Sequence, residues 1–363
     1  MATSNYQIYS TTKEAWTAMA TSLRAATRSI YWEVYLFTDD EIGREFLAIL
    51  IEKAKAGVDI KLIFDYWGSL AISNKKIAEL RALGIDIRLF EDKKRRHLVW
   101  WGIFSSRTHR KILIVDETVG FIGGVNVNHS MRDWLDIHVR LEGKVVRSLL
   151  RSFAKSYIIC GGDKNAVRHL LKYRFRVMHD EFDIIYDEPN TKGSRVRDQY
   201  LRALYKARER VILFSPYYFP DLGFLKALWQ AKKRGVRVDL LIPFRSDLRI
   251  ATAAAFTWFG IMRRAGVRIH FLNKMMHGKG LIVDDDWTMV GSSNIDQNSF
   301  FYNHEANLLT RDPKFVKKIK EIVLEWIDDA KILEDKQWVA RGRWRKFKEW
   351  MALKVYQAFF GVK

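Results

Sequence analysis

An internal repeat constrains the fold of this 363-residue chain more than any other feature. The segment Phe46–Phe64 aligns without a gap with Phe224–Ile242, and each reads as an amphipathic helix, a glycine and an apolar strand. A second helix–glycine–strand unit follows in each half, around Gly84 and Gly266. Alternating strands and helices are typical of βαβ units. We therefore expect an α/β fold of two pseudo-symmetric halves, each a mixed, mostly parallel sheet flanked by helices.

The repeat also predicts how the chain is divided. We expect a first half over residues 1–180, a second half over 181–335 and a C-terminal tail over 336–363. The expected link between the halves contains Asp187–Gly193, whose sequence DEPNTKG is rich in turn residues.

Composition restricts the class of protein and its partners. The 48% of hydrophobic and 29% of charged residues exclude a mainly disordered or fibrous chain. A net charge of +20 favours an anionic partner, either nucleic acid or a membrane surface. The single cysteine, Cys160, cannot form an internal disulfide, which fits a reducing compartment. The apolar run Ile250–Met262 is shorter than the roughly 20 residues that are needed to span a bilayer. We therefore expect a cytoplasmic protein.

Each half carries the same polar motif on a predicted strand–turn–strand. The motif has five positions at identical spacing in both halves: His109, Lys111, Asp116, Gly123 and Asn126 in the first, and His277, Lys279, Asp284, Gly291 and Asn294 in the second. Such a double match inside a sequence repeat is not accidental. The motif is therefore the first candidate for the chemistry of this chain.

The residue types of the motif fit phosphate chemistry. Side chains two apart on a strand face the same side, so His109 projects with Lys111 and His277 with Lys279. Joined across a pseudo-two-fold interface, the two motifs form one pocket. The ammonium groups stabilise phosphoryl oxygens there, and the imidazoles supply covalent and proton chemistry. The sequence thus predicts one active site at the interface of the halves.

Residues in the glycine-containing turns are candidates for binding the phosphate. We expect Asn126, Asn294 and Ser292 to supply hydrogen-bond donors there. Asp116 and Asp284 complete the motif as candidate catalytic residues, but they fall on the opposite strand face from the imidazoles, which favours a role in fixing turns. A metal site is the rival use of a histidine cluster, and we expect none because two lysines repel a dication.

Two carboxylates occupy equivalent places downstream of the motifs. Asp136 lies 27 residues after His109, and Glu305 lies 28 residues after His277. The equivalent placement predicts that each carboxylate orients one imidazole and fixes its tautomer. The alternative is a pair of exposed acids at strand ends.

Two segments combine aromatic and basic residues. Trp100 and Trp101 follow four consecutive basic residues, Lys93–Arg96, in an insertion that only the first half has. Trp344, Phe347 and Trp350 lie in the basic tail, within a predicted amphipathic helix. Indoles beside cations favour contact with an anionic membrane surface. The alternatives are a loop tucked into the core and a helix docked on the body of the protein.

The doubled motif resembles that of the phospholipase D superfamily over about residues 5–330. Within the superfamily, four segments resemble bacterial cardiolipin synthases: Phe121–Asn126, Asp133–Gly143, Ser215–Asp221 and Val290–Leu309. The resemblance implies a phospholipase D-like fold and a metal-free, cofactor-free transfer through a phosphohistidine. It implies that His109 attacks one phosphatidylglycerol while His277 protonates the leaving glycerol, and that a second phosphatidylglycerol then accepts the phosphatidyl group to give cardiolipin.

Other functions stay open at this point. The same pocket would serve a phospholipase D-type hydrolase, a phosphatidyltransferase with another acceptor alcohol, or a nuclease. A non-catalytic lipid-binding scaffold is a further alternative, but it would not need both complete motifs. Basic residues interleaved with Trp and Phe favour lipid over nucleic acid as the partner. We expect a protein bound peripherally to the inner face of the cell membrane, with anionic phospholipids such as phosphatidylglycerol and cardiolipin as ligands.

Overall fold

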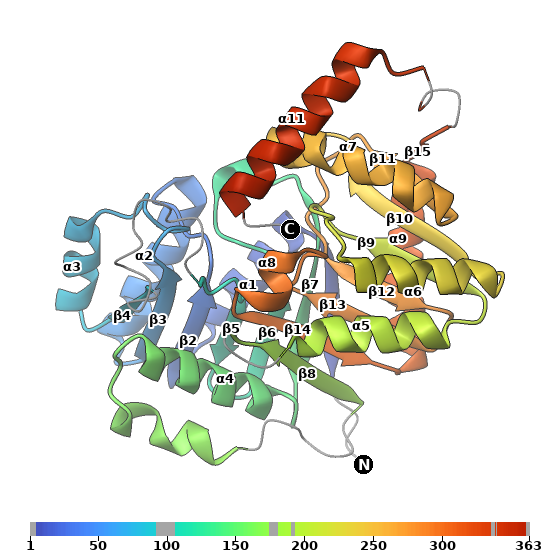
Figure 1. The fold of residues 1–363 in the computed structure, drawn as a ribbon. Helices are drawn as coiled ribbons and strands as arrows, with labels where there is room; N and C mark the ends of the chain where they lie inside the picture. The colour runs from blue at the N-terminus through green and yellow to red at the C-terminus, as the bar shows by residue number, and fades with distance from the viewer. Residues whose placement is uncertain are drawn as a thin grey trace.

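The computed structural model describes residues 5–91, 106–173, 181–189, 193–334, 338 and 340–360. They form two mixed sheets with helices around them (Figure 1).

The first sheet has the strand order β1–β7–β6–β5–β2–β3–β4. Its strands are β1 (Tyr6–Thr11), β2 (Ser29–Val34), β3 (Asp59–Asp65), β4 (Asp86–Phe90), β5 (Ile112–Val115), β6 (Val119–Gly123) and β7 (Leu135–Glu142). The helices of this half are α1 (Thr12–Arg24), α2 (Glu41–Lys55), α3 (Asn74–Ala82), α4 (Val146–Ile159) and the 3-10 helices η2 (His129–Met131) and η3 (Asn165–Lys172).

The second sheet has the order β15–β11–β10–β9–β12–β13–β14–β8. Its strands are β8 (Phe182–Asp187), β9 (Arg210–Phe214), β10 (Arg237–Pro243), β11 (Val267–Leu272), β12 (Gly280–Val283), β13 (Trp287–Gly291), β14 (Glu305–Thr310) and β15 (Lys331–Ile332). The accompanying helices are α5 (Arg195–Lys206), α6 (Leu222–Lys233), α7 (Arg249–Arg264), α8 (Gln297–Phe301), α9 (Pro313–Asp328) and α11 (Arg343–Phe360). None of the helices in the described part of the chain is long and apolar enough to cross a membrane.

The repeated helix–glycine–strand unit folds alike in both halves. Gly57 joins α2 to β3 and Gly235 joins α6 to β10, and both glycines have a φ of 83°. A side chain at this left-handed φ is strained, so glycine ends the helix and turns the chain into the strand. The predicted α/β architecture of two similar halves is confirmed.

The expectation that parallel pairs predominate is wrong. The strands β2–β3–β4 and β9–β10–β11 pair in parallel, and the other strand pairs within the described residues are antiparallel. The reason is the motif itself. Each motif strand, β5 or β12, returns through a short turn to the next strand, and a short turn joins only antiparallel neighbours.

A central core joins the two halves. Leu149 and Phe153 of α4 belong to the same hydrophobic cluster as Ile319 and Val323 of α9, together with strand residues of both sheets. The outer faces are covered separately, by α1, α2 and α3 on the first sheet and by α5, α6 and α7 on the second. Figure 1 accordingly shows α2 and α3 on one side of the molecule and α6 and α7 on the other. The core holds the two sheets in a fixed relation to each other.

Asp116 and Asp284 fix the turns that follow the motif strands. The carboxylate of Asp116 accepts hydrogen bonds from the backbone N–H groups of Thr27, Arg28 and Ser29, at 3.0, 2.7 and 2.9 Å. These bonds tie the turn after β5 to the start of β2. Both aspartates have a left-handed φ of 51°.

Asp284 makes the same contacts in the second half. Its carboxylate accepts hydrogen bonds from the backbone N–H groups of Arg208, Glu209 and Arg210, at 3.1, 2.9 and 2.9 Å. Because these carboxylates are engaged by backbone at the far end of the motif strands, their candidacy as catalytic residues is wrong. The alternative role of fixing turns agrees with the structure.

We expect Asp116→Asn to lower the free energy of unfolding by about 2 kcal/mol at pH 7, because the carboxylate that accepts three backbone donors loses its charge and one acceptor. Although partial burial acts the other way, those donors hold the pKa of Asp116 below its ordinary value. The stabilisation is therefore present above about pH 4 and is lost as the pH falls through the lower folded pKa. Denaturant titrations from pH 2 to pH 7 measure this loss.

The matched control is Asp285→Asn, an identical change in the equivalent turn at a side chain that is 77% exposed and whose surface ion pair with Lys320 contributes little to stability. It should leave the stability nearly unchanged. Equal effects of the two substitutions would contradict the assigned role of Asp116.

Candidate active site

The backbone of each motif is hydrogen-bonded to the opposite half of the protein. The amide of His109 donates to the carbonyl of His304 at 2.9 Å, and the amide of His277 donates to the carbonyl of Leu135 at 2.6 Å. Leu135 in turn donates to the carbonyl of Met275 at 3.0 Å. These crossings place the two histidines at the interface of the two sheets.

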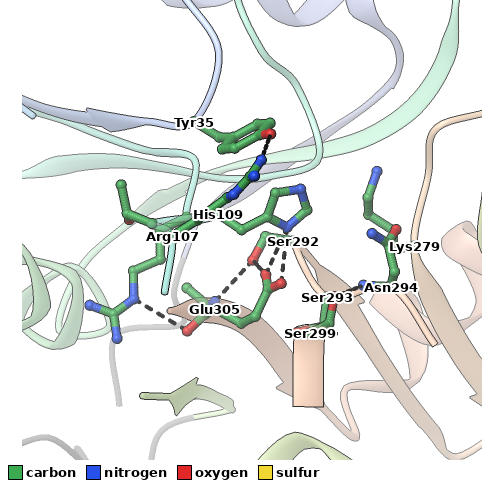
Figure 2. Close-up of polar contacts among 12 residues, drawn as sticks. Tyr35, Arg107, His109, Lys279, Ser292, Ser293, Asn294, Ser299 and Glu305 are labelled. Carbon is green, nitrogen blue, oxygen red and sulfur yellow. Dashed lines mark hydrogen bonds and ion pairs between the residues drawn. The ribbon is translucent and has the colours of Figure 1, made fainter. Parts of the chain in front are cut away.

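Each imidazole is paired with a buried carboxylate of the other half. The Nδ1 atom of His109 lies 3.0 and 3.1 Å from the carboxylate oxygens of Glu305, and Nδ1 of His277 lies 2.9 Å from Oδ2 of Asp136. Figure 2 shows the ring of His109 facing Glu305. The structure thus brings together the four predicted residues, and it excludes the alternative of exposed acids at strand ends. Such a contact leaves Nε2 as the ring atom that can meet a ligand.

The pseudo-symmetry of the two pairs is broken by a serine. The hydroxyl of Ser292 donates to Glu305 and accepts from the amide of Ala306 at 3.0 Å. Its counterpart in the first half is Gly124, where an added Cβ would lie 2.1 Å from Oδ1 of Asp136. Because the Ser292 hydroxyl is engaged by Glu305, the prediction that it binds phosphate is wrong. It supports a carboxylate instead.

Burial and charge set the protonation of the imidazoles. Burial lowers the pKa of His109 to about 4, against the opposing effect of Glu305. Burial and the ammonium of Lys279 also lower the pKa of His277. Burial alone would raise the pKa values of Glu305 and Asp136, but the facing imidazoles and lysines hold both below their ordinary values. With no ligand bound, the site therefore combines neutral imidazoles with ionised carboxylates.

The two motif lysines are buried beside the histidines. Nζ of Lys111 donates to the carbonyl of His109 at 2.6 Å, and Nζ of Lys279 donates to that of His277. Burial holds the pKa of Lys111 well below its ordinary value and lowers that of Lys279 to about 8. A nearby anion reverses such shifts because it favours the charged form. The site is therefore suited to a phosphate group.

The two motif asparagines are buried, but they differ in their contacts. Oδ1 of Asn126 accepts from the amide of Leu36 at 3.2 Å, which leaves Nδ2 as the end of the side chain that can meet a ligand. The backbone amide of Asn294 donates to Oγ of Ser299 at 3.1 Å (Figure 2). Their predicted contact with phosphate stays a prediction.

Sequence reasoning missed three neighbours of the histidines. The ring of Tyr35 packs edge-on against His109 at 5.0 Å, and Arg107 donates to its hydroxyl at 3.1 Å. The ring of Trp134 lies 5.5 Å from that of His277. Arg107 lies two residues before His109 and Trp134 lies two residues before Asp136, whereas Tyr35 lies just after an apolar strand of the first half. That proximity was the only available signal.

Arg110 is a fourth residue that the sequence did not single out. Its buried guanidinium donates to Oγ of Ser156 at 2.9 Å and to the backbone carbonyls of Glu305 and Asp187, both at 3.3 Å. It therefore links the first motif to β8 and β14 of the second half. The equivalent position is Gly278, so the spacing that the two motifs share gave no sign of this role.

The predicted membrane residues fall in two places. Trp100 and Trp101 lie outside the described residues. Trp344, Phe347 and Trp350 are exposed on α11, with Trp344 reaching 69%. This helix also packs on α7, as Figure 1 shows. It docks on the body of the protein and still presents its aromatic side chains outward, so the two alternatives for the tail are not exclusive.

Comparison with known proteins agrees with this geometry. A family model for cardiolipin synthase, PLD-like domain, matches residues 19–156 and 200–326. The chain is 31% identical over 316 residues to a cardiolipin synthase of Halalkalibacterium halodurans, covering 84% of this chain and 62% of that protein. It is 32% identical over 322 residues to cardiolipin synthase A of Pseudomonas fluorescens, covering 85% and 65% respectively. The matches thus span somewhat less than two thirds of these relatives.

Solved structures show the same fold. A phosphatidylserine synthase of Haemophilus influenzae matches with a TM-score of 0.74 at 14% identity, covering 98% of this chain and 92% of that one. A polyphosphate kinase of Porphyromonas gingivalis matches with a TM-score of 0.60 at 12% identity, covering 89% and 47%. With both halves matched by the family model and the two motifs meeting at one interface, the chain belongs to the cardiolipin synthase family of phospholipase D-like proteins.

Proposed function

We propose that this protein is a phosphatidyltransferase that converts two phosphatidylglycerol molecules into cardiolipin and glycerol. One observation carries the proposal: two buried imidazoles, each held at Nδ1 by a carboxylate, with the motif lysines beside them. The names of its relatives support the same reaction.

The first half-reaction breaks the bond between phosphorus and the headgroup glycerol. Nε2 of His109 attacks the phosphorus of the first phosphatidylglycerol and forms a phosphohistidine. The protonated His277 donates its Nε2 proton to the leaving glycerol oxygen, so that glycerol departs neutral. Lys111 and Lys279 stabilise the negative charge on the phosphoryl oxygens as the bond breaks.

The second half-reaction returns both histidines to their starting states. The now neutral His277 removes the proton from a headgroup hydroxyl of the second phosphatidylglycerol. The hydroxyl oxygen attacks phosphorus, the bond between phosphorus and His109 breaks, and cardiolipin leaves. If water takes the place of the second lipid, the product is phosphatidic acid.

The charges of the loaded site balance. Two protonated lysines offset the two carboxylates, and one imidazolium offsets the single negative charge of a phosphodiester. Burial disfavours protonation of either histidine in the empty site. A bound phosphodiester raises the pKa of a neighbouring imidazole. Binding of substrate therefore prepares the acid that the first step needs.

Ser292 supports the assignment of the two histidine roles. Its hydrogen bond withdraws negative charge from Glu305, so His109 is held by the weaker electrostatic partner and stays neutral more readily. Asp136 has Gly124 in the corresponding place. Its Oδ1 accepts from the backbone amide of Ile137 at 2.8 Å, but Oδ2 is the oxygen that contacts His277, whereas Ser292 binds an oxygen of Glu305 that also contacts His109. This asymmetry favours His109 as nucleophile and His277 as acid and base.

The proposed place of action is the inner face of the cell membrane, with α11 as a contact. Trp344, Phe347, Trp350 and Met351 are exposed on this helix, whereas Glu349 is buried against the body. The aromatic rings stack on one another, with 5.5 Å between the centroids of Trp344 and Phe347. Exposed indoles on a basic helix suit the interface of an anionic lipid surface.

Incubation of the protein with phosphatidylglycerol liposomes in EDTA tests the reaction. Mass spectrometry of the lipid and aqueous products should find cardiolipin and free glycerol in equal molar amounts. If phosphatidic acid were the only lipid product, the protein would be a hydrolase and not a transferase. Unchanged phosphatidylglycerol would contradict both.

A chromogenic donor separates the two histidine roles. We expect His277→Ala to release one equivalent of p-nitrophenol from phosphatidyl-p-nitrophenol and then stop, since this leaving group needs no acid but the intermediate needs a base. His109→Ala should release none. Stopped-flow absorbance measures the burst, and a burst in His109→Ala with none in His277→Ala would reverse the roles.

The membrane contact is tested by a triple substitution on α11. We expect Trp344→Ala, Phe347→Ala and Trp350→Ala together to weaken binding to phosphatidylglycerol liposomes at least tenfold in sedimentation assays, because the apolar area that enters the interface is removed. The matched control replaces Tyr205, Leu222 and Trp229, which are exposed on or beside α5 and α6, by alanine. An equal loss in the control would argue against a specific role of α11.

A further inference from the structure

A cavity lies between α11 and the start of α7, and none of its lining residues belongs to the two motifs. Its volume is about 490 Å³. Its apolar lining is formed by Phe244, Ala253 and Phe256, and its basic lining by Arg245, Arg345 and Lys348. The volume is within the range of pockets that hold one small ligand.

The charge of this groove is positive even after its internal ion pairs are counted. Glu349, which also lines it, is paired with Arg341 and lies 3.1 Å from Nε of Arg345. The guanidinium of Arg345 lies over the ring of Phe256 at 5.2 Å. The remaining cations of the lining, Arg245 and Lys348, are both exposed. An apolar floor below a basic rim complements an amphiphile with an anionic head.

One loop extends from the groove toward the active site. Residues 244–248 join β10 to α7, and they begin with two groove residues, Phe244 and Arg245. In the same loop, Oδ1 of Asp247 accepts a hydrogen bond from the hydroxyl of Tyr217 at 2.5 Å. The Asp247 carboxylate is also close enough to Lys279 to act on it electrostatically. This loop therefore runs from the groove toward the neighbourhood of Lys279.

The groove also adjoins the exposed aromatic face of α11. Lys348 lines the groove, and its Nζ lies 5.8 Å from the ring of Trp344. The aromatic face of α11 and the basic rim of the groove therefore adjoin each other at Lys348.

We propose that this groove binds one anionic phospholipid molecule, separately from the phosphate pocket between the histidines. An acyl chain packs on Phe256, Ala253 and Phe244, and the phosphate lies between Arg245 and Lys348. The inference rests on the proposed function in one respect, that the ligand is a phospholipid. The site holds a lipid in addition to the one that reacts at the histidines.

Native mass spectrometry with a short-chain lipid tests the site. The probe is dihexanoyl phosphatidylglycerol below its micelle concentration, and His109→Ala provides a background without turnover. We expect Ala253→Trp, which fills the groove, to remove one bound lipid from the count. The pair Arg245→Glu and Lys348→Glu should weaken that binding step at least tenfold, while the control pair Lys55→Glu and Lys75→Glu, with the same change of net charge in the first half, should not.

Comparison ligands identify what the groove recognises. Dihexanoyl phosphatidylcholine should bind this site more weakly, since its head has no net negative charge, and glycerol 3-phosphate should not occupy it, since it has no acyl chain. Equal lipid counts in all variants, with folding verified by circular dichroism, would overturn the site. Occupation by glycerol 3-phosphate with equal affinity would overturn the acyl contact.

The outcome is independent of whether the reaction is assigned correctly. If the wild-type protein forms no cardiolipin, and Ala253→Trp binds one lipid fewer than its parent, the proposed reaction is wrong and the lipid site in the groove is supported. If the wild-type protein forms cardiolipin, and the groove variants bind as many lipids as their parent, the proposed reaction is supported and the lipid site in the groove is wrong.

Discussion

The contacts of His109 with Glu305 and of His277 with Asp136 are those on which the rest of the structure depends. In each pair, the imidazole and the carboxylate come from different halves of the chain. A buried carboxylate without a partner is costly, so each half lacks a stable arrangement of its own polar residues until the other half is in place. The central core and the backbone hydrogen bonds between the halves fix the position of the two sheets, and thereby the geometry of these two contacts.

The same pairing explains why so many charged groups are tolerated in one buried place. Two lysines, two carboxylates and two histidines lie at the interface, and the lysines and the facing imidazoles keep the pKa values of both carboxylates below their ordinary values. The lysines are bound to the carbonyl groups of their own motif histidines, so they cannot turn away toward solvent. A site with this arrangement is prepared for an anionic phosphate before the phosphate arrives, which lowers the reorganisation that catalysis requires.

Much of this could be predicted from the sequence, because duplication displays each feature twice. The helix–glycine–strand units and the motif residues His109 and His277 were all visible as repeated patterns. The proportion of parallel pairs was not, since the direction of β5 and β12 depends on short turns that the helix pattern does not report. Features present in one half only were also missed or misjudged: Arg110 has no counterpart, and Ser292 was assigned to the ligand instead of to Glu305. Contacts between residues almost 200 positions apart, such as His109 and Glu305, follow from how the sheets pack and not from local sequence.

The difference between Ser292 and Gly124 has a consequence for the history of this architecture. In a dimer of identical subunits, the two histidines would share one environment, and each would have to serve equally as nucleophile and as acid. Joining two copies in a single gene frees the copies to diverge. A hydroxyl group present in one copy only, such as that of Ser292, then helps to give the two rings different preferences for a proton, and the separate roles that the proposed reaction needs are encoded in one gene.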